Sequence, residues 1–252
     1  MNPTFLQYEK PLLTVMIQTP SPEDAFRRIE AAKQAGGEAF GLQVEALPRE
    51  EQNDERYQAL MKAMEGYPVY VTHYRSGFNK GLTDDQLAEE LLHFADLGGT
   101  LFDVMTDYFD PTPGEYTENP AAVAKQKELI AKLHAKGKEV LMSCHVLKPI
   151  PAEEVLKIAL AQQERGADIV KIVTGAKTME EQVENLRIVT ILKENLKVPF
   201  LYLSGGKTSI LRRVGIHLGC CMSLCVYEHD EHTTPAQPLL SAAKAVRDDL
   251  GF

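Results

Sequence analysis

Eight short apolar runs recur along the chain, and this repetition constrains the possible fold more than any other feature. They occupy residues 12–17, 39–46, 69–74, 100–105, 139–144, 168–173, 200–203 and 222–227. Runs of this length and composition predict buried strands, and the stretches between them have the periodicity of amphipathic helices. The spacing, about 30 residues, is that of one strand–helix unit in a parallel sheet. Eight units predict an α/β fold, a single-domain (β/α)8 TIM barrel over residues 1–252.

The ends of four intervening helices can be read from their capping residues. Ser21, Thr83, Pro151 and Thr178 each precede acidic residues, which predicts helix starts at these positions. Glycines at 36, 98 and 166 predict the ends of the first three helices. A doubly wound sheet is less favoured, because residues 18–24 read QTPSPED and lack the glycine-rich turn that binds dinucleotides.

The charge balance limits the kind of partner. The 27 basic and 36 acidic residues give a net charge of −9 without a basic stripe, so we expect no nucleic-acid partner. No apolar run approaches the roughly 20 residues that span a bilayer. The first residues also lack the features of an export signal, so we expect a cytoplasmic protein with no membrane partner. Reduced thiols are expected for the four cysteines, and a small-molecule substrate is the expected partner.

Lys171 is the strongest candidate for a catalytic residue. It lies in the apolar run Ala-Asp-Ile-Val-Lys-Ile-Val, which predicts a strand buried on both faces. Desolvation favours the neutral amine, which can attack a ketone to form a Schiff base. The alternative is a lysine that extends to solvent or forms a structural salt bridge.

His145 favours the catalytic interpretation of Lys171. It ends the fifth predicted strand, next to the strand that carries Lys171. Reactive groups of such barrels gather at the carboxyl ends of the strands. A histidine there can remove and return the protons that chemistry beside an iminium requires.

Several motifs resemble the type I 3-dehydroquinate dehydratases. Residues 141–173 match a strand ending in Ser-Asn-His followed by Gly-Ala-Asp-Ile-Pro-Lys-Ile, residues 74–77 match Phe-Arg-Ser-Ala, and residues 234–237 match Ala-Pro-Gly-Gln. The resemblance implies a (β/α)8 barrel, commonly a homodimer, with no metal or organic cofactor. It also implies that Lys171 forms an imine with the substrate ketone, and that His145 carries a proton from the neighbouring carbon to the departing hydroxyl. The family reaction belongs to the shikimate pathway of aromatic amino acid biosynthesis.

The resemblance also implies which residues bind the substrate, a carboxylated polyhydroxy ketone. Arg75, Arg212 and Gln237 match the family's residues that hold the carboxylate and hydroxyls. Gln43 and Thr233 complete the predicted substrate-binding set. A guanidinium suits this role because it stays charged and binds a carboxylate through two parallel hydrogen bonds.

Four positions depart from the family pattern. Gly41 replaces a glutamate that binds substrate hydroxyls, and Gln43 replaces an arginine. Asn79 replaces the glutamate that orients the histidine, so Asn79 is the expected partner of His145. An amide has no charge to stabilise an imidazolium, which predicts a weaker or differently tuned base. Met105 replaces a strand-four glutamate.

These departures leave other functions open. The leading hypothesis is a hydro-lyase that dehydrates 3-dehydroquinate or a related cyclic ketone. A class I aldolase-like enzyme would use the same imine on a different carbonyl compound. A catalytically silent paralogue would bind a ligand without turnover, and a metal-dependent lyase would use Glu45, Asp103 and His145 as ligands.

Overall fold

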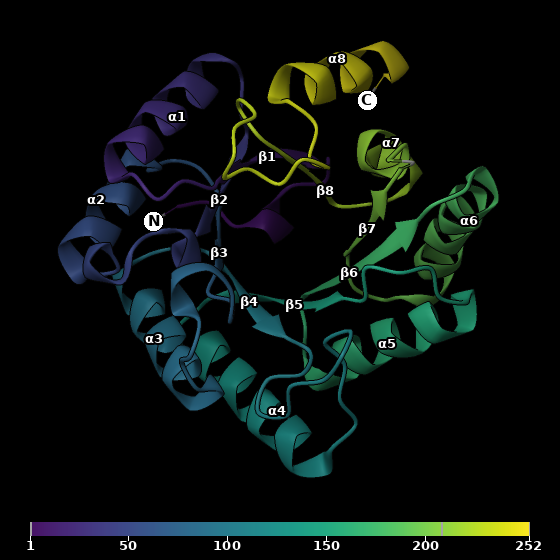
Figure 1. Cartoon of the computed structure of the whole chain (residues 1–252), viewed down its shortest axis with the longest axis horizontal. Coiled ribbons are helices and arrows are strands. Elements are labelled where there is room, and N and C mark those ends of the chain that lie inside the picture. Colours follow the sequence, from purple (N-terminus) through teal and green to yellow (C-terminus); the bar gives the residue numbers. More distant parts are fainter. Residues whose placement is uncertain (1, 208, 252) are drawn as a thin grey trace.

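The eight strands form one nearly closed parallel barrel (Figure 1). The computed structural model describes residues 2–207 and 209–251. Its strands are β1 (Leu12–Ile17), β2 (Ala39–Gln43), β3 (Val69–Thr72), β4 (Leu101–Met105), β5 (Glu139–His145), β6 (Ile169–Ala176), β7 (Phe200–Gly206) and β8 (Met222–Cys225). They are hydrogen bonded in the order β7-β6-β5-β4-β3-β2-β1-β8. The predicted (β/α)8 barrel is confirmed.

Helices surround the strands as an outer ring (Figure 1). They are α1 (Pro22–Gln34), α2 (Asp54–Ala63), α3 (Asp84–Leu97), α4 (Pro120–Ala135), α5 (Ala152–Arg165), α6 (Met179–Asn195), α7 (Leu211–Leu218) and α8 (Leu240–Leu250). The four predicted starts are confirmed. The side chains of Ser21, Thr83 and Thr178 accept N–H groups of the first turns of α1, α3 and α6, and α5 begins directly after Pro151.

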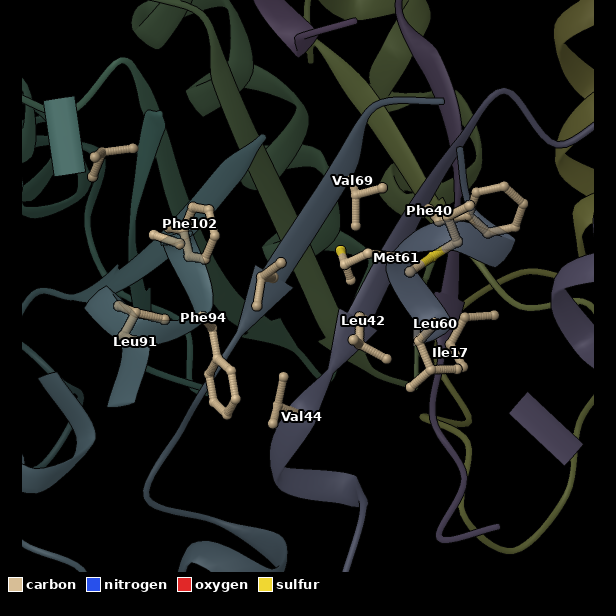
Figure 2. Packing of buried hydrophobic residues seen from close by; sticks show 14 of the residues in the cluster. Ile17, Phe40, Leu42, Val44, Leu60, Met61, Val69, Leu91, Phe94 and Phe102 are labelled. Carbon is tan, nitrogen blue, oxygen red and sulfur yellow. The ribbon is translucent and has the colours of Figure 1, made fainter. Parts of the chain in front are cut away.

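Alternation along the strands divides the buried residues into two layers. Outward residues such as Leu42, Val69 and Phe102 are fully or almost fully buried by helices (Figure 2). Leu60 of α2 and Phe94 of α3 are among the residues that cover them. A second apolar cluster joins inward residues such as Leu101 and Leu141 to outward residues of β6 and β7 and to the residues of α5 and α6 that cover them. Asp103 and Lys171 are buried polar side chains within the barrel.

The amino-terminal end of the barrel is covered by the chain's own first residues. A short helix, η1 (Phe5–Gln7), lies beside the start of β5. The backbone N–H groups of Phe5 and Leu6 donate to the Glu139 carboxylate at 2.9 and 3.1 Å, and Phe5 is buried. The carboxyl ends of the strands therefore form the end where a substrate site is expected.

Two further expectations concern cysteines and membranes. Cys144, Cys220, Cys221 and Cys225 are free thiols, as expected. None of the described helices combines the length and the apolar composition needed to cross a membrane.

Candidate active site

Strand register brings the predicted catalytic residues onto one inward face. In the β5–β6 ladder Ser143 pairs with Lys171, and His145 pairs with Val173. Because alternate residues of a strand point to the same side, Ser143, His145 and Lys171 share a face. Met105 pairs with Ser143 in the β4–β5 ladder, which places Asp103, two residues earlier, on this face as well.

Lys171 is the centre of a buried polar cluster inside the barrel. Its side chain is 5% exposed. The Nζ atom lies 3.0 Å from Tyr70 Oη, 2.8 Å from Tyr74 Oη and 3.4 Å from Asp103 Oδ2. Lys171 and Asp103 therefore form a buried ion pair whose remaining hydrogen-bonding positions are used.

Asp103 accepts hydrogen bonds from every neighbouring donor of this cluster. Tyr70 and Tyr74 both donate to Oδ2, and Ser143 Oγ donates to Oδ1 at 2.5 Å. Burial, reinforced by the charge of Asp103, raises the pKa of both tyrosines well above the usual value. The tyrosines therefore remain protonated donors at neutral pH. The cluster surrounds the amine with polar groups in an otherwise apolar barrel.

His145 is hydrogen bonded to Glu115, which follows β4 in the loop leading to α4. Its Nδ1 atom lies 2.6 Å from Glu115 Oε2, and its backbone N–H donates to the same oxygen at 3.1 Å. Burial pushes the pKa of Glu115 upward, but the hydrogen bonds from His145 and the positive charge of Lys171 outweigh it and lower this pKa. Glu115 is therefore ionised at neutral pH, and Nε2 of His145 is left for a substrate.

The predicted pairing of Asn79 with His145 is wrong. Asn79 Nδ2 lies 3.2 Å from His73 Nδ1 and donates to Tyr74 O at 3.0 Å. His73 follows an inward residue of β3, so its ring points outward and packs against Phe94. Asn79 consequently belongs to the layer behind the strands. Glu115 supplies the negative charge whose loss was expected to weaken the base.

An open cavity of about 720 Å³ lies beside His145. Tyr74, Arg75, Lys80 and Glu115 line it together with His145. Lys171 is not among the lining residues, and the ring of Tyr74 packs edge-on against His145 at 5.4 Å between centroids. Tyr74 therefore lies between the cavity and the amine.

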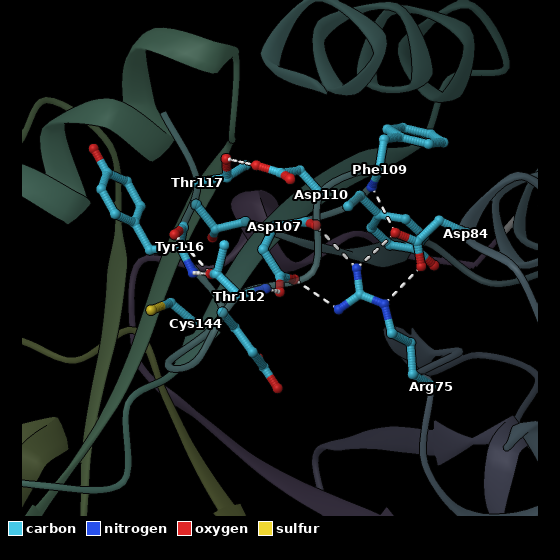
Figure 3. A network of polar contacts seen from close by, with 12 residues as sticks. Arg75, Asp84, Asp107, Phe109, Asp110, Thr112, Tyr116, Thr117 and Cys144 are labelled. Carbon is cyan, nitrogen blue, oxygen red and sulfur yellow. Dashed lines mark hydrogen bonds and ion pairs between the residues drawn. The ribbon is translucent and has the colours of Figure 1, made fainter. Parts of the chain in front are cut away.

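Arg75 lies at the cavity wall, but two carboxylates already bind it (Figure 3). Nε and Nη2 donate to the two oxygens of Asp84 at 2.6 and 2.8 Å, and Nη1 donates to Asp107 at 2.8 Å. These ion pairs hold the loops after β3 and β4 together. A substrate carboxylate would have to share the guanidinium with Asp84 and Asp107.

Arg212 differs from Arg75 in that no carboxylate among the described residues neutralises its guanidinium. It lies in the first turn of α7, is 9% exposed, and donates from Nε to Ser204 O at 2.9 Å. No ion pair involves it within residues 2–207 and 209–251, and burial lowers its pKa to about 10. A buried cation without a carboxylate partner is suited to binding an anionic ligand.

The other predicted substrate-binding residues lie after β2 and β8. Gln237 is buried, and its Oε1 atom has no hydrogen-bond partner among the described residues. Thr233 is also buried, but its hydroxyl closes a turn by bonding to the backbone of Asp230. Gln43 ends β2 in register with Thr72. Of the three, Gln237 has the clearest capacity for a substrate hydroxyl.

A larger residue at position 41 would require the Met16 side chain to move. A Cβ atom added there would lie 2.2 Å from the sulfur of Met16, its register partner on β1. The Met16 side chain therefore occupies the volume beside Gly41, and a thioether replaces the acidic group expected from the family pattern.

Glu45 is a buried carboxyl whose two oxygens lie 2.9 and 3.0 Å from Thr72 Oγ1. Burial raises its pKa to about 7. Since this exceeds the unfolded value, its stabilising contribution is complete below pH 4.5 and is lost as pH rises through 7. We expect Glu45→Gln to raise the free energy of unfolding by about 2 to 3 kcal/mol at pH 8 and to change it little at pH 4. Denaturant unfolding of the wild type and of Glu45→Gln at both pH values checks this, with exposed Glu50→Gln as the control. If Glu45→Gln and the wild type unfold at the same denaturant concentration at pH 8, the prediction is contradicted.

The predicted metal ligands do not converge. Glu45 binds Thr72, Asp103 binds the lysine cluster, and His145 binds Glu115. No group of three His, Cys, Asp or Glu side chains with the spacing of a metal site occurs within the described part of the chain.

Comparison with known proteins shows the family of the chain. The family model described as Type I 3-dehydroquinase matches residues 13–248. The chain belongs to the type I 3-dehydroquinase family. A curated 3-dehydroquinate dehydratase of Aromatoleum aromaticum is 25% identical over 197 residues, which cover 76% of this chain and 70% of that protein.

Two further proteins are similar to this member of the type I 3-dehydroquinase family. The 3-dehydroquinate dehydratase of Alkaliphilus oremlandii is 34% identical over 89 residues, so the match covers 34% of this chain and only 35% of that protein. The type I 3-dehydroquinate dehydratase of Clostridium difficile, solved with covalently modified comenic acid, superposes with a TM-score of 0.80 at 19% identity. That superposition covers 96% of this chain and 93% of the other, and it shows the shared barrel fold. Family and relatives together support a dehydratase lyase.

Three residues of this type I 3-dehydroquinase site were missed in the sequence. Tyr70 and Tyr74 are four positions apart, so both point to the inward side of β3, where they contact Lys171. Alternation along the strand is the sequence signal that indicates this. Glu115 lies in a loop 30 positions before His145, and no local pattern indicates that it folds back onto β5.

Proposed function

We propose that the chain dehydrates 3-dehydroquinate, or a related carboxylated cyclic ketone, through an imine at Lys171. The observation that carries this proposal is a buried amine next to the carboxyl end of β5, where His145 presents a free Nε2. Arg212 would bind the substrate carboxylate, and Gln237 a hydroxyl. Family membership supports the reaction class, and the polar cluster around Nζ supports the nucleophile.

The proposed reaction removes one water overall. Lys171 Nζ first gives one proton to Asp103, and its freed lone pair then attacks the ketone carbon. The oxygen of the resulting carbinolamine takes a proton and leaves as water, which gives an iminium. His145 Nε2 takes a proton from the neighbouring carbon, and those electrons form an enamine. The enamine expels the β-hydroxyl, which leaves as water with the proton from His145. Water then hydrolyses the iminium, releasing the enone product and restoring the amine.

Tyr74 has to move for this reaction to begin. Its hydroxyl occupies one face of the amine, and its ring lies between the amine and the cavity that His145 lines. Rotation of this side chain opens the route from the cavity to Nζ. The tyrosine hydroxyl can then donate to the oxygen that leaves as the carbinolamine dehydrates, because its pKa keeps it protonated.

Met16 beside Gly41 favours a substrate with less polar character on that side. A carboxylate there would accept hydrogen bonds from substrate hydroxyls, whereas the thioether is a weak acceptor. This observation keeps a related ketone, dehydrated or cleaved through the same imine, as the second candidate. A silent paralogue would instead be stabilised by the ligand without turnover.

Incubation with 3-dehydroquinate and borohydride tests the proposal. We expect mass spectrometry to find a reduced adduct on Lys171, and ultraviolet absorbance to show the conjugated enone. An adduct without enone indicates imine chemistry on a different substrate. Folded protein that gives neither adduct nor enone excludes the proposed function.

A further inference from the structure

One carboxylate oxygen fixes the ring of His145 through two hydrogen bonds. Glu115 Oε2 accepts from the backbone N–H at 3.1 Å and contacts the ring Nδ1 at 2.6 Å. Bonds to the backbone and to the ring of one residue define the ring's rotation as well as its position. Since Nδ1 faces the carboxylate, the proton is held on Nδ1 and the Nε2 lone pair is free.

A hydrogen-bond network holds the loop that carries Glu115 (Figure 3). Arg75 donates to Asp107 Oδ1 at 2.8 Å, and the backbone N–H of Thr112 donates to Asp107 Oδ2 at 2.8 Å. Thr112 Oγ1 accepts the N–H of Tyr116 and donates to its carbonyl. The N–H of Glu115 donates to Thr112 O at 3.1 Å. The chain of contacts therefore runs from Arg75 to the residue that bonds His145.

Glu115 adopts a backbone conformation that a non-glycine residue rarely adopts. Its φ is +57°, and that of the preceding Gly114 is +90°. Left-handed backbone is unfavourable for a non-glycine residue, because its Cβ atom crowds the following carbonyl oxygen. The surrounding contacts maintain it, since Gly114 O also accepts Cys144 Sγ at 2.9 Å beside the histidine. Strain kept at one residue of a cavity wall is typical of a functional position.

We propose that Glu115 is the positioning residue of His145, and that Arg75 acts mainly by holding the loop that presents this carboxylate. The proposal rests on the proposed role of His145 as the proton carrier. Glu115 keeps Nε2 basic and then stabilises the imidazolium that forms when Nε2 takes a proton. It supplies, from the loop after β4, the charge that Asn79 cannot supply.

Other groups facing His145 do not replace this carboxylate. The ring of Tyr74 contacts it from β3, and the cation of Lys171 lies on the adjacent β6. Arg75 and Lys80 line the same cavity as cations, while Asp107 is already bound to Arg75. Glu115 is therefore the carboxylate that neutralises an imidazolium at this position.

Nitrogen NMR of the His145 ring tests the proposal without any substrate. We expect the neutral ring of the wild type to carry its proton on Nδ1, and Glu115→Ala to shift the population toward the Nε2–H form. Glu118→Ala is the matched control, because Glu118 is an exposed carboxylate of the same loop bonded to Tyr116 and Lys157. A Glu115→Ala ring with the wild-type tautomer overturns the proposal.

Kinetics of Glu115→Gln separate charge from geometry. The amide oxygen can still accept both hydrogen bonds, so the ring stays in place while the charge is lost. We expect kcat to fall about 10- to 100-fold with little change in KM, and Glu118→Gln to leave both unchanged. The acid limb of the rate profile should move to lower pH, which a merely structural residue would not cause. If Glu115→Gln leaves both kcat and the pH–rate profile unchanged, the proposal is contradicted. If the wild type shows no turnover, the proposed function is contradicted, and the NMR measurement then decides whether Glu115 positions His145.

Discussion

Lys171→Met is expected to abolish both the borohydride-trapped adduct and turnover, with kcat lowered about a thousandfold or more. No other described lysine has its amine within the Tyr70, Tyr74 and Asp103 cluster. Adduct mass and steady-state kinetics measure the effect. Lys177→Met is the matched control, because Lys177 is an exposed lysine just after β6 and should leave both unchanged.

Loss of activity in Lys171→Met must be separated from loss of stability. Removing one partner of a buried ion pair costs about 3 to 5 kcal/mol, because Asp103 would keep an uncompensated charge. The double variant Lys171→Met with Asp103→Asn removes both charges, and we expect it to recover most of that stability. It should remain inactive. Turnover by a folded Lys171→Met variant would show that the amine is not the nucleophile.

The barrel and the reactive pair follow from patterns that the sequence carries locally. Strand runs and caps are short-range signals, and the predicted strand positions agree with the observed bounds to within a few residues. Adjacency of His145 and Lys171 follows from chain order, because consecutive strands of a barrel are neighbours. Prediction therefore worked where a residue's place depends on its own strand and the next one.

The hydrogen-bond partner of His145 could not be predicted, because it depends on the conformation of a loop and on which side of β3 each residue faces. The family motif places Asn79 beside His145, but the turn that carries Asn79 lies behind β3, beside outward-facing His73. Glu115 reaches His145 through a left-handed backbone conformation stabilised by contacts from several loops. Such conformations result from tertiary hydrogen bonds and leave no periodic signal.

The effect of glycine in place of the family's glutamate at position 41 can be understood only together with the neighbouring side chain of Met16. The sequence shows the loss of a glutamate, whereas the structure shows Met16 filling the space that its side chain would need. The two positions are 25 residues apart in the chain and are joined by the β1–β2 register. Recognition on this side of the barrel has therefore changed in shape as well as in charge.

Arg212→Met is expected to raise KM for a carboxylated substrate about 100- to 1000-fold while leaving the fold intact or more stable. A bound carboxylate would be the counter-ion of this buried guanidinium, and removing one partner of such a pair costs about 2 to 5 kcal/mol. In the free protein the burial that lowers the pKa of Arg212 to about 10 is unfavourable to the charged form. The unfavourable contribution of Arg212 to stability should therefore shrink as pH rises above 10, so the stability difference between the variant and the wild type should narrow there.

Three comparisons distinguish a ligand-binding arginine from a structural one. Arg213→Met changes the adjacent exposed arginine, which bonds to Ser209, and should leave KM unchanged. A substrate analogue with a carboxamide in place of the carboxylate should bind wild type and Arg212→Met equally weakly. Thermal unfolding should show a stabilising effect of substrate in the wild type that the variant lacks. A variant that is destabilised yet retains the wild-type KM would assign Arg212 to the support of the β7–α7 connection, because its bond to Ser204 would then be its main contribution.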